Sequence, residues 1–216
     1  MTSAALSDRL KLIVITDADL AFPRTVVEVA RDALRAGASA IQLRDKRGGG
    51  AELFTTARAL LDCTQETGAL LFINDRVDVA LAVGAHGVHV GPDDIPVGAI
   101  RASVPSDFLI GTSTDDPSQA RRLASAGADY IGCGTVYETS SKPDGGSVIG
   151  LHGLERVATS VEIPVIGIGG ISAERSAEVA STSAAGIAVI GAVMSAEDVG
   201  AAVSRLLAPW VGPENR

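Results

Sequence analysis

Residues 164–193, PVIGIGGISAERSAEVASTSAAGIAVIGAV, hold two short β-branched runs on either side of one helical pattern. The runs are Pro164–Ile168 and Ile187–Ile190, and the helical pattern covers Ala173–Ser181. Strands that alternate with helices in this way are typical of βαβ units in a parallel sheet. Glycine follows each run at once, as Gly169-Gly170 and as Gly191. The segment therefore predicts a strand–helix–strand unit with a glycine-rich turn after each strand.

The same alternation continues along the rest of the chain. Six further β-branched runs are expected to be strands, namely Leu12–Thr16, Ala40–Leu43, Leu70–Ile73, Gly87–Val90, Phe108–Ile110 and Tyr130–Gly132. Seven further helices are expected near Thr25–Ala36, Ala51–Thr67, Val77–Val83, Val97–Ser103, Pro117–Ala126, Leu151–Ser160 and Ala196–Leu207. Eight strand–helix units predict a closed (β/α)8 barrel, of the TIM-barrel type, in the α/β class. An open doubly wound sheet is the alternative.

The chain is expected to form one domain over residues 1–216, with flexible termini at 1–9 and 209–216. Hydrophobic residues make up 46% of it and aromatic residues only 3%, as suits aliphatic strands covered by helices. The net charge of −8 disfavours nucleic acid and anionic membranes as partners, and no apolar stretch approaches the ~20 residues that span a bilayer. Two distant cysteines, Cys63 and Cys133, indicate a cytoplasmic protein. The oligomeric state stays open, with a homo-oligomer as one option.

The active site of such a barrel lies where the strands end. The second strand ends in Gln42-Leu43-Arg44-Asp45-Lys46, and alternation points Gln42, Arg44 and Lys46 toward the barrel mouth. Two cations beside an amide, in an acidic chain, suit an anion such as a diphosphate. A solvated strand end is the alternative interpretation.

Carboxylates follow the next two strands. Asp75 comes directly after the third strand, within Asn74-Asp75-Arg76, and Asp94 lies shortly after the fourth. Because neighbouring strands end side by side, both carboxylates are candidate ligands for one Mg²⁺ ion. Capping of the following helices is the alternative. His89, in the fourth strand, is interpreted as a packed core histidine in preference to a catalyst.

Hydroxyl groups and glycines follow the remaining strands. The fifth is followed by Gly111–Thr114, whose hydroxyls can donate to a phosphate, although such residues also stabilise turns. The sixth leads into a long loop that carries three hydroxyls and Lys142, typical of a lid that binds an anion. After the seventh and eighth strands, exposed backbone amides predict a phosphate cradle.

Taken together, these residues resemble the thiamine phosphate synthase family, from about Leu12 to about Leu206. The order and spacing of the matching segments are much more specific than any one of them. These segments are Gln42–Lys46, Asn74-Asp75-Arg76, His89-Val90-Gly91 with Asp94, Gly111 with Ser113, the Thr139–Lys142 loop, and Ile168-Gly169-Gly170-Ile171.

The resemblance implies a transferase that condenses 4-amino-2-methyl-5-hydroxymethylpyrimidine diphosphate with a thiazole phosphate. The products are thiamine phosphate and pyrophosphate, formed by a dissociative, Mg²⁺-assisted substitution. It implies pyrimidine diphosphate contacts from the segment that contains Leu43 and Asp45 and from Gln42, Arg44, Lys46, Asn74, Ser113 and Lys142. Of these, Arg44, Lys46, Ser113 and Lys142 are expected to be catalytic. It implies Asp75 and Asp94 as the metal ligands, and thiazole phosphate contacts from Thr139, Ser140, Ser141, Gly170, Ile190 and Gly191.

The sequence departs from the family pattern at Pro92, Asp115, Glu138, Ser141 and Gly191. Glu138 is the least expected of these, since it adds a negative charge near a phosphate. Two other functions compete with the synthase: a thiazole tautomerase-like isomerase and a non-catalytic phosphate-ligand sensor. The two aspartates and Lys142 favour the synthase. So does Asp115, which stands where the tautomerase carries a catalytic histidine.

Overall fold

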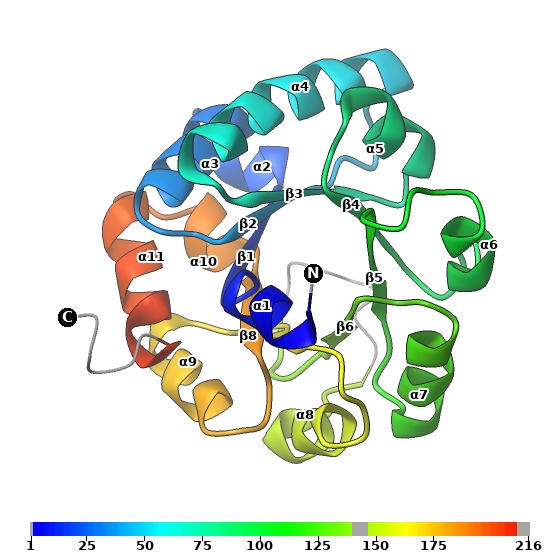
Figure 1. Ribbon diagram of the computed structural model, residues 1–216. Coiled ribbons are helices and arrows are strands. Elements are labelled where there is room, and N and C mark those ends of the chain that lie inside the picture. Colours follow the sequence, from blue (N-terminus) through cyan, green and yellow to red (C-terminus); the bar gives the residue numbers. More distant parts are fainter. Residues whose placement is uncertain (1, 140–146, 211–216) are drawn as a thin grey trace.

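The protein, as a computed structural model, is described over residues 2–139 and 147–210. Eight strands pair in parallel in the order of the sequence, and β1 also pairs with β8, with Leu12 opposite Ile187. Helices surround this closed sheet (Figure 1). The predicted (β/α)8 barrel is therefore confirmed, and the open-sheet alternative is wrong because the two edge strands bond to each other.

The predicted strands and helices agree with the observed ones to within three residues at each end. The strands are β1 (Leu12–Ile15), β2 (Ala40–Leu43), β3 (Leu70–Asn74), β4 (Gly87–Val90), β5 (Leu109–Ser113), β6 (Tyr130–Cys133), β7 (Val165–Ile168) and β8 (Gly186–Val189). The helices that follow them in the barrel are α3 (Val26–Arg35), α4 (Gly50–Thr67), α5 (Val77–Val83), α6 (Val97–Arg101), α7 (Pro117–Ser125), α8 (Gly150–Ala158), α9 (Ala173–Ala180) and α11 (Val199–Leu207). Four short helices were not predicted: α1 (Ser3–Asp8), α2 (Ala18–Ala21), α10 (Gly191–Met194) and the 3-10 helix η1 (Ala208–Trp210).

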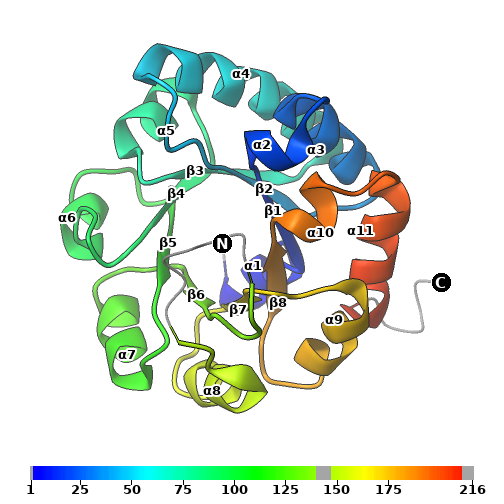
Figure 2. The same cartoon turned by 180° about the vertical axis from the view of Figure 1, so that it is seen from behind.

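The strands are buried on both faces, which explains their continuous aliphatic runs. All four residues of β1 and of β2 are buried, and the helix ring covers the outer face of the sheet (Figure 2). Local signals set the helix ends. Helix α3 begins with a capping box between Thr25 and Glu28, and α4 ends at Gly68, whose left-handed backbone suits glycine.

The N-terminal segment, which was expected to be a flexible end, holds a short helix. Residues Ser3–Asp8 form α1, whose N-terminus is capped by the Thr2 hydroxyl, and α1 lies across the barrel opening (Figure 1). Leu6 is only 4% exposed and Leu10 is fully buried, so this apolar pair closes the barrel from the N-terminal side. The free energy gained by burying these two side chains offsets the conformational entropy that the segment loses when it becomes ordered.

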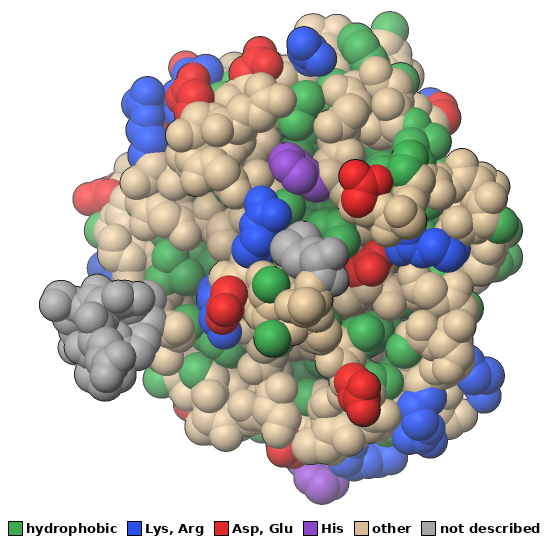
Figure 3. Space-filling model, in the orientation of Figure 1, with side chains coloured by type: hydrophobic (Ala, Val, Ile, Leu, Met, Phe, Trp, Pro, Cys, Tyr) green, Lys and Arg blue, Asp and Glu red, His purple; other side chains and the backbone are tan. Residues whose placement is uncertain are grey.

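At the other end of the chain, Trp210 also has a fixed contact. Its indole Nε1 donates to Ser176 Oγ at 3.0 Å, and residues 211–216, the rest of the expected flexible tail, lie outside the described residues. On the face that α1 crosses, Lys and Arg side chains are interspersed with Asp and Glu (Figure 3). In the described part of the chain, no helix is both long enough and apolar enough to cross a membrane.

Candidate active site

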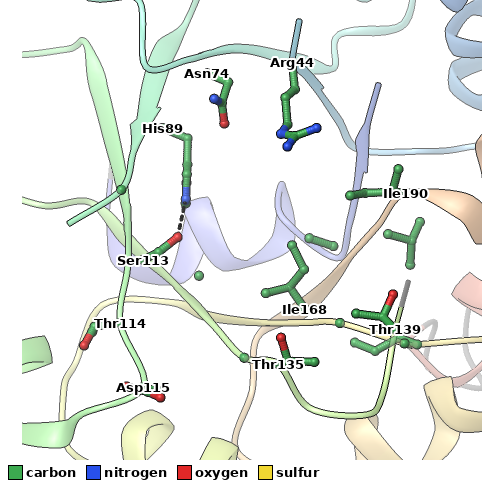
Figure 4. Close-up of a pocket in the computed structure, with 18 of the residues that line it drawn as sticks. Arg44, Asn74, His89, Ser113, Thr114, Asp115, Thr135, Thr139, Ile168 and Ile190 are labelled. Carbon is green, nitrogen blue, oxygen red and sulfur yellow. Dashed lines mark hydrogen bonds between the residues drawn. The ribbon is translucent and has the colours of Figure 1, made fainter. Parts of the chain in front are cut away.

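A cavity of about 770 Å³ lies at the C-terminal ends of the strands, where barrels of this type place their active sites. Figure 4 shows several of its side chains around one space, including Arg44 beyond β2, Asn74 on β3, His89 on β4 and Ser113 on β5. The predicted site residues that line it are Arg44, Lys46, Asn74, Asp75, Asp94, Ser113, Thr139, Gly170, Ile190 and Gly191. The structure thus brings together ten predicted residues from the ends of seven strands, β2 to β8.

Of the three side chains that alternation points toward the barrel mouth at the end of β2, two line the cavity. Arg44 and Lys46 line the cavity, while Asp45 turns back on its own loop and accepts hydrogen bonds from the backbone N–H groups of Arg47 and Gly48, both at 2.9 Å. These two donors hold the pKa of Asp45 below its usual value. The carboxylate of Asp45 therefore closes the loop and does not line the cavity.

Two other predicted binding residues, Leu43 and Gln42, are buried and do not line the cavity. Leu43 is buried in the core, and Gln42 is only 3% exposed. The Gln42 side-chain Nε2 donates to Asn74 Oδ1 at 2.8 Å. Because Asn74 Oδ1 accepts this hydrogen bond, the NH₂ group of Asn74 faces away from the Gln42 amide. Gln42 thus positions Asn74, which lines the cavity itself.

The backbone places Asp75 and Asp94 toward each other. Among the described residues other than glycine, Asp75 is the one with a positive φ, at 63°, a conformation that aspartate tolerates better than most residues. Its N–H donates to the His89 carbonyl at 2.9 Å, and the Gly91 N–H donates to Asp94 Oδ2 at 2.8 Å. Neither aspartate caps a following helix, since the N-cap residues of α5 and α6 are Arg76 and Pro96. The helix-capping interpretation is therefore wrong.

The two carboxylates oppose each other electrostatically. Burial, hydrogen bonding with Asp94 and the charge of Asp94, in this order, raise the pKa of Asp75 to about 6. The cations Lys46 and Arg44 act in the opposite direction but offset this rise only in part. A divalent cation between the two aspartates would compensate for this repulsion.

The donor set fits Mg²⁺, which prefers hard oxygen ligands and keeps several waters. Two carboxylates are enough for such an ion when a substrate phosphate supplies further oxygens. Over residues 2–139 and 147–210, no group of three or more His, Cys, Asp or Glu side chains could hold a metal.

His89, which the sequence analysis interpreted as a packed core histidine, is buried and also borders the cavity. It lies on β4, lines the cavity, and has its Nε2 atom 2.8 Å from Ser113 Oγ and its Nδ1 atom 2.9 Å from the Tyr130 hydroxyl. The dashed line in Figure 4 marks the contact with Ser113. His89 is two residues after Gly87, so the two residues face the same side of β4, but all four residues of this strand are buried and alternation alone does not show which side is the barrel interior. Thr135, which was not named as a candidate, also lines the cavity, as does Thr114 of the hydroxyl segment that was expected after the fifth strand.

The glycine-rich ends of β7 and β8 border the opposite side of the cavity. Gly169 and Gly170 have φ values of 102° and 61°, and a Cβ at Gly170 would lie 2.5 Å from the Glu138 carbonyl oxygen. The segment that leads to Thr139 therefore packs tightly against this turn. Ile190 is the N-cap residue of α10, so the N–H groups at the start of this short helix border the cavity.

Three predicted residues, Ser140, Ser141 and Lys142, lie outside the described residues. Glu138, the least expected departure, is exposed and does not line the cavity, so its charge faces solvent. Pro92 and Asp115 do line the cavity. Within the described residues, the lysine and arginine side chains that line the cavity are Lys46 and Arg44.

Replacing Gly111 with alanine is expected to destabilise the fold near the site. Gly111 lies on β5, and a Cβ there would be 2.1 Å from Tyr130 Cζ and 2.4 Å from its hydroxyl oxygen. The buried ring has to move, which costs about 2 kcal/mol or more and lowers the melting temperature by roughly 5 °C. Thermal unfolding measures this effect. Gly49→Ala, with no atom within 4 Å of its Cβ position, is the control, and equal losses in both variants would contradict the packing argument.

Comparison with known proteins agrees with this geometry. Residues 12–193 match the family model described as thiamine monophosphate synthase. The chain is 45% identical over 195 residues to the thiamine-phosphate synthase of Methanoculleus marisnigri. The aligned residues cover 90% of this chain and 92% of that protein. It is also 45% identical over 201 residues to the thiamine-phosphate synthase of Pyrococcus furiosus. This alignment covers 93% of this chain and 95% of that protein.

Solved structures give the same result. A thiamine phosphate pyrophosphorylase from Pyrococcus furiosus superposes with a TM-score of 0.85 at 44% identity, over 93% of this chain and 95% of that one. A 3-hexulose-6-phosphate synthase also superposes, with a TM-score of 0.70 at 19% identity over 93% of this chain and 99% of the other. The second likeness shows the barrel fold alone.

Proposed function

The chain belongs to the thiamine monophosphate synthase family, and on this premise we propose that it condenses 4-amino-2-methyl-5-hydroxymethylpyrimidine diphosphate with a thiazole phosphate. The products are thiamine phosphate and pyrophosphate. The observation that carries the proposal is one cavity with three features: two cations, a carboxylate pair, and a glycine-rich cradle. A diphosphate, a divalent cation and a second phosphate group are the ligands that suit these three features.

The pyrimidine diphosphate is proposed to bind at the ends of β2 to β5. Arg44 and Lys46 hold its diphosphate, and Asn74 and Ser113 donate hydrogen bonds to it. As the C–O bond between the methylene carbon and the diphosphate breaks, the pyrophosphate leaves with the bonding electron pair. The two cations stabilise the negative charge that grows on it, which is electrostatic catalysis by groups already in place.

The thiazole phosphate is proposed to bind across the cavity. Backbone N–H groups at Gly170, Ile190 and Gly191 and the Thr139 hydroxyl hold its phosphate, together with Ser140, Ser141 and Lys142, which lie outside the described residues. This remote contact orients the thiazole ring, so that its nitrogen lone pair forms the new C–N bond with the methylene cation. Such a reaction needs no protein nucleophile.

Asp75 and Asp94 would hold the Mg²⁺ ion, which when bound neutralises charge on the diphosphate oxygens. The carboxylate pair fits this role, because its own repulsion raises the pKa of Asp75 and a cation would relieve that repulsion. In the proposal, the two aspartates thus set where the diphosphate lies relative to Arg44 and Lys46.

Mixing the protein with both substrates and Mg²⁺ is expected to release pyrophosphate and thiamine phosphate in equal amounts. Omission of either substrate, or chelation of the metal, should abolish the release. A coupled pyrophosphate assay together with chromatography of the products measures both. An isomerase would change the thiazole phosphate without the pyrimidine substrate, and a sensor would bind without turnover, so either result would reject the synthase.

A further inference from the structure

Three side chains from neighbouring strands form a continuous hydrogen-bonded row beneath the cavity. Tyr130 on β6 contacts His89 Nδ1 on β4 at 2.9 Å, and His89 Nε2 contacts Ser113 Oγ on β5 at 2.8 Å. Tyr130 is 1% exposed and does not line the cavity, whereas His89, which is 9% exposed, and Ser113 both line it. The row therefore leads from the barrel core to the surface that would meet a substrate.

The direction of the first hydrogen bond follows from the burial of Tyr130. Burial raises the pKa of its phenol well above the usual value, so the hydroxyl keeps its proton. Within the described residues, the acceptor that the structure gives to this hydroxyl is His89 Nδ1. A proton on Nδ1 would instead leave the buried phenol proton without an acceptor, which is costly in a protein interior. Tyr130 therefore donates and Nδ1 accepts.

The direction of the second hydrogen bond follows from the first. A neutral imidazole carries one N–H group, so with Nδ1 as the acceptor the proton lies on Nε2. His89 Nε2–H then donates to Ser113 Oγ, and the single hydroxyl proton of Ser113 turns away from the ring. For the same reason His89 is not a base for Ser113, although the two side chains are as close as a nucleophile and its base.

We propose that Tyr130 and His89 are positioning residues that fix Ser113 as an oriented hydrogen-bond donor to the substrate. The inference rests on the proposed function for the identity of that substrate. The partner is a lone-pair acceptor of the pyrimidine diphosphate, a ring nitrogen or a diphosphate oxygen. Fixing the donor in advance lowers the entropy lost when the substrate binds.

The packing around the row is built to hold it. Gly111 leaves the space that the Tyr130 ring fills, and a Cβ at Gly132 would lie 3.1 Å from His89 Cε1. Phe72 contacts the Tyr130 ring edge-on, with centroids 5.2 Å apart. Two glycines and one aromatic contact thus fix the rings that set the direction of the hydrogen bonds.

Nitrogen-15 NMR of the ligand-free protein tests the tautomer directly and does not depend on the reaction. The chain has three histidines, so comparison with His89→Gln assigns the signals. We expect the ring of His89 to be neutral, with a protonated Nε2 and an unprotonated Nδ1. Finding the proton on Nδ1 would overturn the positioning role, even if the proposed function holds.

Kinetics of Tyr130→Phe test the consequence for the substrate. Losing one hydroxyl that orients a buried partner is expected to lower kcat/KM for the pyrimidine diphosphate about tenfold. KM for the thiazole phosphate should stay unchanged. Thr64→Val is the control, because it removes a fully buried hydroxyl that bonds to Leu61 O within α4, away from the cavity. An equal loss of kcat/KM in the two variants would show that Tyr130 has only a structural role.

Two amide variants of His89 separate positioning from simple packing. Glutamine places an NH₂ donor near the position of Nε2, whereas asparagine reaches only to the position of Nδ1. We expect His89→Gln to retain most of the activity with the pyrimidine diphosphate and His89→Asn to lose about tenfold or more. The opposite order, or equal activities, would contradict the donor role of Nε2. If no variant or parent protein turned over the substrates, the proposed function would fail while the NMR result still decided the tautomer.

Discussion

Replacing Asp75 with asparagine is expected to lower kcat/KM by about a hundredfold or more, because the neutral amide removes half of the proposed Mg²⁺ site. Asparagine is the informative change, since Asp75 has a φ of 63° and asparagine tolerates that conformation, whereas alanine would add backbone strain. Steady-state rates over a range of Mg²⁺ concentrations measure the effect. The variant should also need more Mg²⁺ for half-maximal activity.

The stability of the same variant distinguishes a lost ligand from a damaged fold. At pH 7.5, above its raised pKa of about 6, Asp75 is ionised, and its charge beside Asp94 opposes folding when no cation is present. This opposition vanishes below the ordinary pKa of 3.8, where the group is protonated in both states. The metal-free variant should therefore melt no lower than the parent protein at pH 7.5.

Asp78→Asn is the matched control for this charge change. Asp78 lies three residues further on, bonds to Arg76 at 2.6 Å and is not among the residues that line the cavity. Its replacement should leave the rate and the Mg²⁺ requirement unchanged. Near-normal turnover of Asp75→Asn at every Mg²⁺ concentration would reject the metal assignment.

Local periodicity explains how much of the site could be predicted from the sequence. Alternation along the strand predicted that Arg44 and Lys46 face the barrel mouth, and both line the cavity. Asp45, between them, instead bonds to the backbone of its own loop. Glycine positions likewise predicted the turns after β7 and β8. These features depend on residues close together in the sequence.

Other features depend on contacts between strands and could not be predicted in this way. His89 stands in an aliphatic strand, and the same local sequence suits a packed histidine. Its role depends on Ser113 and Tyr130, which the register of β4, β5 and β6 brings beside it, with His89 opposite Gly111 and Ser113 opposite Gly132. The closure of the barrel by α1 was missed for a similar reason, since it depends on where Leu6 is buried.

Replacing Arg44 with alanine is expected to lower kcat/KM for the pyrimidine diphosphate by about a hundredfold or more. In a chain with a net charge of −8, the phosphate ligand depends on cations placed locally, and Arg44 lines the cavity (Figure 4). Its backbone is fixed from both sides, because the Arg44 N–H donates to Thr16 Oγ1 at 2.9 Å and the Thr16 hydroxyl donates to the Arg44 carbonyl at 3.2 Å. The Arg44 side chain therefore extends from a backbone that is held in place, and electrostatic catalysis depends on charges that are positioned in advance.

Arg44→Lys and Arg47→Ala complete this test. Lysine keeps the charge but loses the planar fork that binds two phosphate oxygens, so we expect an intermediate loss of about tenfold. Arg47 lies three residues further on, is 71% exposed and pairs with Asp19, so its removal changes the net charge equally without touching the cavity. Equal rates for Arg44→Ala and Arg47→Ala would show that only the overall charge matters. A rise in KM confined to the thiazole phosphate would instead assign Arg44 to the second substrate.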